Sequence, residues 1–199
     1  MENGLGAHLG EHLNFIYIST EEEALFKWKP PQSFKSYLLD MNIVRENKME
    51  DVFFHINKGN MKIAYIRKGE LIYAIGSDEC VQFQILEAIL EETYQQFNEM
   101  YDVKVILSYG NVSANTFVGF KSVLDPLIKD FLRSDAIKKV TVHCRVCDKM
   151  LPLYLKKSYI ENADSYPVSI VYNHKGHAIL CFIDKNYGVR GVELVSMTG

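Results

Sequence analysis

The stretch "MKIAYIRKGELIYAIGSDECVQFQILEAILEETYQQF", residues 61–97, combines two strand patterns with one long helix pattern. The strand patterns, at 61–68 and 71–77, are separated by a short turn containing Gly69, which is typical of an antiparallel hairpin. Apolar residues then recur every three or four positions through 81–101, which predicts an amphipathic helix. The side chains expected on its buried stripe are Leu86, Leu90, Phe97 and Met100.

The segments on either side extend this pattern into an α+β domain. Three more apolar runs lie upstream and predict strands at 14–19, 24–29 and 51–56. A helix is expected over residues 31–41, after the strand-ending prolines. Downstream, the pattern predicts a strand at 103–110 and a helix at 116–133 that bends or restarts at Asp125 and Pro126.

This order of elements, across about residues 13–133, resembles the longin domain of adaptor small subunits, of the signal-recognition-particle receptor and of some SNARE proteins. The likeness is strongest at 61–97, because longins of adaptor type show a strand ending in basic residues, a Gly turn, a strand, an acidic cap and an amphipathic helix in this order. The strand expected at 103–110 departs from that pattern and is closer to the related roadblock arrangement.

The resemblance implies a longin/profilin-like fold, in which helices flank a five-stranded antiparallel sheet within residues 13–110. It also implies a non-catalytic domain that binds small GTPases, other longin-type subunits or peptides.

A second, β-rich module follows. Strands are expected at 138–144, 166–173, 177–184 and 189–197, and a loop or short helix at 152–163. Residues 1–135 carry 13 Lys and Arg against 20 Asp and Glu, whereas residues 136–199 carry 9 against 5. The opposite signs of net charge favour two modules: a longin-like domain over 1–135 and a small zinc-binding β module over 136–199.

The zinc prediction comes from two residue pairs in the second module. Cys144 and Cys147 form a C-x2-C pair, and His174 and His177 follow at the same spacing on the tip of an expected hairpin. Two thiolates and two imidazoles are a common tetrahedral ligand set for Zn²⁺. We therefore expect one zinc ion, and a structural one, because four protein ligands leave no position for water or substrate.

Other interpretations of these residues stay open on the sequence alone. His143 or Cys181 is an alternative ligand in place of a histidine, although Cys181 also fits a buried strand position. If there is no zinc site, the simplest alternative is that the cysteines are ordinary thiols and the histidines are turn residues. A second alternative is that the cysteine pair is redox active. The redox interpretation is the weakest, because Pro152 follows the pair where a helix N-terminus would be needed to lower a thiol pKa. Cys80 is expected to be a small buried residue.

The sequence carries none of the common catalytic motifs: GxGxxG, phosphate loop, GxSxG or HExxH. It therefore predicts a non-enzyme, an adaptor or scaffold whose partner is a small GTPase or another longin-type subunit. The alternatives are a metalloenzyme and a nucleic-acid-associated factor, although the basic charge is weaker than nucleic-acid binding usually requires. The basic residues of that second alternative are Lys138, Lys139, Arg145, Lys149, Lys156, Lys157 and Lys175.

The expected location is the cytoplasm, because there is neither a signal-peptide pattern at the start nor an apolar run long enough to span a bilayer. Peripheral membrane association and a homodimer both stay open.

Overall fold

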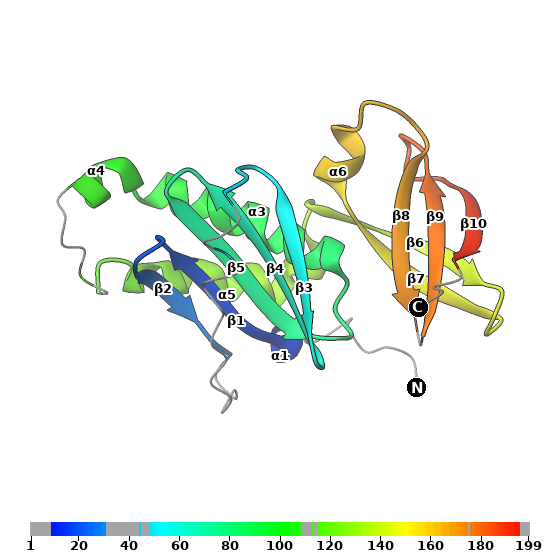
Figure 1. Cartoon of the computed structure of the whole chain (residues 1–199), viewed down its shortest axis with the longest axis horizontal. Helices are drawn as coiled ribbons and strands as arrows, with labels where there is room; N and C mark the ends of the chain where they lie inside the picture. Colours follow the sequence, from blue (N-terminus) through cyan, green and yellow to red (C-terminus); the bar gives the residue numbers. More distant parts are fainter. Residues whose placement is uncertain are drawn as a thin grey trace. The chain divides into compact units, whose positions relative to one another are not determined.

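The computed structural model describes residues 9–30, 44, 48–108, 113, 115–174 and 176–195. The chain divides into two compact units, Met1–Arg133 and Ser134–Gly199, called here the first and second unit. The division falls two residues before the boundary expected from the change in charge. Figure 1 shows both units.

A five-stranded antiparallel sheet forms the centre of the first unit, as the sequence predicts (Figure 1). Its strands are β1 (Leu13–Ser19), β2 (Ala24–Trp28), β3 (Phe53–Lys58), β4 (Met61–Lys68) and β5 (Leu71–Asp78). The order across the sheet is β2-β1-β5-β4-β3, so β3, β4 and β5 form a meander and β1 pairs with β5. The two meander turns contain Gly59 and Gly69 at φ 58° and 59°, a left-handed conformation that favours glycine.

One face of this sheet is covered by helices. They are α3 (Phe83–Met100) and α5 (Lys121–Asp130), the latter flanked by short 3₁₀ turns at Val118–Phe120 and Phe131–Arg133. The α3 helix packs on β4 and β5 and contacts α5. Phe120, just before α5, lies 5.2 Å from Phe26 of β2 and 5.0 Å from Phe97 of α3, ring centre to ring centre, so it joins the three elements.

The expected stripe on α3 is correct for three of its four residues. Leu86, Leu90 and Phe97 are fully buried, but Met100 is 46% exposed and that part of the prediction was wrong. Met100 is the last helical residue, and the chain becomes extended at Tyr101. The ring of the next residue, Tyr101, packs against Phe97, at 5.0 Å between ring centres.

The opposite face of the sheet carries its own buried cluster of apolar side chains. Its members come from β1, β4 and β5, together with Val44: Phe15, Tyr17, Val44, Ile63, Tyr65, Ile72 and Ala74. Gly76 is required here, because a Cβ atom at that position would lie 2.3 Å from the Phe15 ring. The helix expected at 31–41 lies outside the described residues.

The strand expected at 103–110 is wrong over the part that the structure describes. Val103–Ser108 form a short helix, α4, and residues 109–110 lie outside the described ranges. The backbone N–H of Val105 donates to Asp102 Oδ1 at 3.2 Å, so Asp102 caps a helical turn that the apolar alternation had obscured. The feature that pointed toward a roadblock arrangement is therefore absent from Val103–Ser108.

Asp125 and Pro126 do not restart the last helix. The α5 helix runs through both residues. Asp125 Oδ1 instead accepts a hydrogen bond of 2.7 Å from the indole Nε1 of Trp28, which ties α5 to the edge strand β2. Pro126 lies inside α5 and has no N–H to donate to the Ser122 carbonyl, so the helix continues with one backbone hydrogen bond fewer.

Over residues 134–174 and 176–195, the second unit consists of two antiparallel sheets and one short helix. Its elements are β6 (Ile137–Cys144), β7 (Lys149–Lys156), α6 (Lys157–Glu161), β8 (Val168–His174), β9 (His177–Ile183) and β10 (Val189–Val195). The β6-β7 pair and the β10-β9-β8 sheet share one apolar core. The loop or short helix expected at 152–163 is a strand up to Lys156 and a helix from Lys157, so that prediction was half right.

None of the helices within the described ranges is long and apolar enough to cross a membrane.

The packing of α3 gives the first stability prediction. Leu90→Asp should lower the free energy of unfolding of the first unit by several kcal/mol, because it places an unpaired charge at a fully buried position. The measurement is urea unfolding of the full chain followed by Trp28 fluorescence, since Trp28 is the single tryptophan and is buried in this unit. Gln95→Asp, on the exposed side of the same helix, should change the value by less than about 0.5 kcal/mol. Equal effects of the two variants would contradict the packing.

Candidate metal centres

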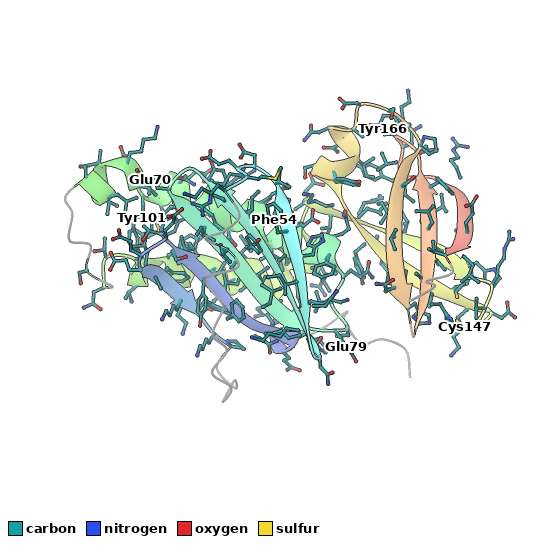
Figure 2. All side chains as sticks on the ribbon, in the orientation of Figure 1. Phe54, Glu70, Glu79, Tyr101, Cys147 and Tyr166 are labelled. Atoms are coloured by element: carbon teal, nitrogen blue, oxygen red, sulfur yellow. The ribbon has the colours of Figure 1, made fainter. Side chains whose placement is uncertain are left out.

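The predicted cysteine ligands lie in the turn between β6 and β7. Cys144 ends β6 and is buried, and Cys147 lies in the turn and is half-buried; Figure 2 labels Cys147. Backbone N–H groups of Cys147 and Val146 donate to the Cys144 sulfur, and these hydrogen bonds lower the pKa of Cys144. Burial and the neighbouring Cys144 sulfur raise the pKa of Cys147. The turn therefore stabilises one thiolate and sets the second sulfur beside it.

The predicted histidine ligands lie on the β8–β9 hairpin. His174 ends β8, His177 begins β9, and the two residues are direct cross-strand partners. His174 is buried and His177 half-buried. The turn between them contains Gly176 at φ 79°. The hairpin therefore sets the two histidines directly across from each other on neighbouring strands.

The structure does not bring the two pairs to one point. Within the described residues, no three of the four ligand atoms of Cys144, Cys147, His174 and His177 lie within 4.8 Å of one another. Figure 1 draws the β6–β7 turn and the end of β8 toward the same, lower end of the second unit. The zinc site at these residues stays a prediction, and its ligands would have to move together to hold an ion.

The two alternative ligands have other surroundings. His143 Nε2 lies 2.8 Å from Asp148 Oδ1 on the surface of the β6–β7 turn. Cys181 is fully buried in the same apolar cluster as Cys144, as the strand pattern predicts, and burial raises its pKa to about 11. Of the two, Cys181 is the one that packs in the same core as a predicted ligand.

A different group of potential ligands is assembled in the first unit. His12, Asp78 and Cys80, called here the first-unit cluster, have ligand atoms that all lie within 4.8 Å of one another. His12 Nδ1 lies 2.7 Å from Asp78 Oδ2 and 3.3 Å from the Cys80 sulfur. The Cys80 thiol donates to Asp78 Oδ1 at 2.7 Å.

The sheet topology brings these residues together from distant parts of the sequence. His12 ends the short helix α1 (Leu9–His12), immediately before β1. Because Leu13 of β1 pairs with Ser77 of β5, His12 comes to lie beside Asp78 at the end of β5. Cys80 follows in the turn before α3, next to Glu79, which Figure 2 labels at this edge of the sheet.

The first-unit cluster has no local signature in the sequence. His12 and Asp78 are 66 residues apart, and Cys80 was expected to be buried, whereas it is exposed. The cluster could have been predicted only from the pairing of β1 with β5, because this pairing places the ends of two distant segments side by side. The spacing of residues along the sequence does not reveal which strands pair.

The arrangement does not resemble an activated cysteine nucleophile. In a nucleophilic triad the thiol contacts one ring nitrogen and the carboxylate orients the other. Here both groups approach the same Nδ1 atom of His12. Burial and the hydrogen bond to Asp78 raise the pKa of Cys80 to about 12, so the thiol stays protonated at neutral pH. Three donors that converge on one point suit the binding of an ion better than proton relay.

A scan against models of known protein families gives no match for this sequence, and a search of curated proteins finds no relative.

The prediction for the second unit is that Zn²⁺ content falls by about one equivalent in Cys144→Ser and in Cys147→Ser, because each removes a thiolate ligand. The measurement is metal analysis of the full chain after equilibrium dialysis against Zn²⁺. His174→Gln should give the same loss if the histidines are ligands. If Cys181→Ser loses the ion while His174→Gln keeps it, Cys181 replaces that histidine. Unchanged zinc content in both Cys144→Ser and Cys147→Ser would remove the site.

The contacts of Cys80 in the first-unit cluster predict that its exposed thiol is alkylated slowly. With chelator present at pH 8, iodoacetamide should alkylate Cys80 roughly tenfold or more slowly than a cysteine in a short peptide, because the thiolate is the reactive form. Asp78→Asn should accelerate the reaction, since it removes the negative charge that raises the Cys80 pKa. Peptide mass spectrometry measures the rate at Cys80 itself. A rate equal to the peptide's, or one insensitive to Asp78→Asn, would contradict the raised pKa.

Proposed function

We propose that the chain is a non-catalytic protein-binding adaptor or scaffold. Its first unit is a longin-like domain that docks a small GTPase or another longin-type subunit. Its second unit is a small β module held by structural zinc, which offers a second and more basic surface.

The observation that carries this proposal is the order and pairing of elements in the first unit. Two strands, then three strands in a meander, then the long helix α3 and the later helix α5 agree with the order that the longin resemblance implies, apart from the helix expected at 31–41, which lies outside the described residues. The helix α4 stands where the departure toward roadblock proteins was expected. This arrangement supports the longin-like interpretation of the residues quoted at 61–97.

The sheet edge at β3 suits docking. β3 is the last strand of the sheet, and three of its six residues are exposed, His55, Asn57 and Lys58. The segment leading into it carries two exposed apolar side chains, Met49 at 58% and Val52 at 39%. An edge strand offers backbone hydrogen-bonding groups to a partner strand, and neighbouring apolar side chains add buried area to such a contact. We therefore assign the partner to the β3 edge.

The other edge is less suited to this role. Leu25, Phe26 and Trp28 of β2 are buried, and Trp28 is held by Asp125 of α5. The side chains of β2 thus belong to the core of the unit, and its exposed residues in the strand are Ala24 and Lys27. An edge whose apolar side chains are already buried has less to offer a partner than the β3 edge.

The nucleic-acid alternative is weakened by the positions of the basic residues. Lys156 is buried. Lys157 pairs with the Asp135 carboxylate, and the Lys139 ammonium lies 5.9 Å from the centre of the Tyr154 ring. Phosphate binding needs several exposed cations on one face. Lys138, Lys139, Arg145 and Lys149 are exposed, and Lys175 lies outside the described residues, so two of the seven basic residues are buried or paired with a carboxylate.

The test of the docking surface uses two exposed valines of the first unit. Val52→Asp should weaken binding of the partner GTPase roughly tenfold or more, because it places a charge in the apolar part of the β3 edge. Val118→Asp, at a position that is 60% exposed and preceding α5, should leave the affinity unchanged. Both positions are exposed, so both variants should fold.

The binding measurement is a pull-down by the full chain of co-resident small GTPases, each loaded with a GTP analogue or with GDP. Binding should depend on the nucleotide, because the switch segments of a GTPase order around the γ-phosphate. Absence of binding in both nucleotide states would remove the GTPase interpretation. Equal losses in Val52→Asp and Val118→Asp would remove the β3 edge as the docking surface.

A further inference from the structure

We propose that His12, Asp78 and Cys80, the first-unit cluster, form a binding site for one divalent transition-metal ion, and that the ion is Zn²⁺. This site is separate from the zinc site predicted in the second unit. It also goes beyond the proposed function, because it does not depend on what docks at the β3 edge.

The geometry is close to that of a metal-bound ligand set. His12 Nδ1 lies 2.7 Å from Asp78 Oδ2 and 3.3 Å from the Cys80 sulfur, and that sulfur lies 2.7 Å from Asp78 Oδ1, so the carboxylate presents a different oxygen to each neighbour. Around a tetrahedral Zn²⁺ with bonds of about 2.0–2.3 Å, ligand atoms lie about 3.3–3.8 Å apart. The three side chains therefore need to separate by about 1 Å or less for an ion to replace the hydrogen bonds between them.

The donor atoms select the type of ion. One imidazole nitrogen, one carboxylate oxygen and one sulfur form a mixed set that suits Zn²⁺. Mg²⁺ and Ca²⁺ prefer sites made of oxygen ligands alone. The thiol gives up its proton when the ion binds, so the bound cluster carries one thiolate and one carboxylate against the charge of the ion.

The carboxylate is oriented before any ion arrives. Asp78 Oδ1 accepts a hydrogen bond of 3.1 Å from the backbone N–H of Cys80, which holds the turn after β5 against the carboxylate. A second contact of Oδ1 comes from the Cys80 thiol, and Oδ2 faces His12. Ligands held by their neighbours lose less conformational freedom on binding, which favours affinity.

One nearby cation, the Lys62 ammonium, opposes the ion, because the charges of Cys80 and Asp78 act on the Lys62 pKa. The Lys62 ammonium donates to the carbonyl oxygen of Val81 at 3.0 Å and lies 5.4 Å from the centre of the Phe83 ring. Glu79, in the same turn, adds a negative charge beside Asp78. The balance of formal charge around the bound ion is therefore negative, as a divalent cation requires.

The first-unit cluster offers three protein ligands, whereas the zinc site predicted in the second unit has four. Three protein ligands leave one position of a tetrahedral ion for water or for a side chain of a partner. The ion would also join the start of β1 to the turn between β5 and α3. Binding to the folded state alone raises the stability of the first unit in proportion to the logarithm of ion concentration.

The experiment uses Trp28 fluorescence of the full chain, because this single tryptophan reports thermal unfolding of the first unit. Added Zn²⁺ should raise the midpoint of that transition in the wild-type chain. Cys80→Ser and Asp78→Asn should each abolish the rise. Asp51→Asn is the matched control, since it removes one exposed carboxylate next to Lys68, at the opposite end of β4 from Asp78, and should keep the rise.

Metal analysis after dialysis against Zn²⁺ separates the two units. Cys80→Ser should lose about one equivalent, and Cys144→Ser should keep the Zn²⁺-induced rise seen by Trp28. A rise that persists in both Cys80→Ser and Asp78→Asn, or a wild-type chain that shows neither the rise nor a loss of zinc in Cys80→Ser, would overturn the proposal.

Discussion

The first unit depends on the burial of one apolar stripe of α3 against the central strands β4 and β5. Leu86, Leu90 and Phe97 are fully buried on that stripe, and Phe97 lies edge-on to Tyr73 of β5 at 6.2 Å between ring centres. At about 25 cal/mol per Å² of apolar surface removed from water, such side chains outweigh any single polar contact in the unit. The meander needs this helix because a sheet with one bare apolar face is not stable in water.

The same packing explains why functional groups gather at particular edges. With β4 and β5 fixed under α3, β1 pairs with the free side of β5 and β3 with the free side of β4. The first pairing brings His12 to Asp78. The second leaves β3 as the outer strand with its exposed side chains. The docking edge and the first-unit cluster thus follow from one arrangement of strands, although they lie on different strands and involve different chemistry.

The sequence predicted well what repeats along the chain and poorly what depends on distant pairing. Apolar runs bounded by turn residues located all five strands of the first sheet, and the helical period of α3 identified Leu86, Leu90 and Phe97. The local pattern was wrong at Met100, which ends α3 and is exposed, and at Val103–Ser108, where the Asp102 cap favours a helix over a strand-like pattern. The C-x2-C spacing drew attention to the second unit, whereas the first-unit cluster joins residues 66 positions apart and has no local motif.

Amide hydrogen exchange of the full chain tests most directly whether α3 on β4 and β5 is the constraint that holds the first unit together. Amides in β5 and in the middle of α3 should exchange slowest and together, at the rate of global unfolding, while those of the edge strands β2 and β3 exchange faster. That result would show that the first unit unfolds only when the apolar stripe of α3 separates from the sheet. Exchange of β5 as fast as that of β3, or protection of α3 without protection of β5, would contradict the account.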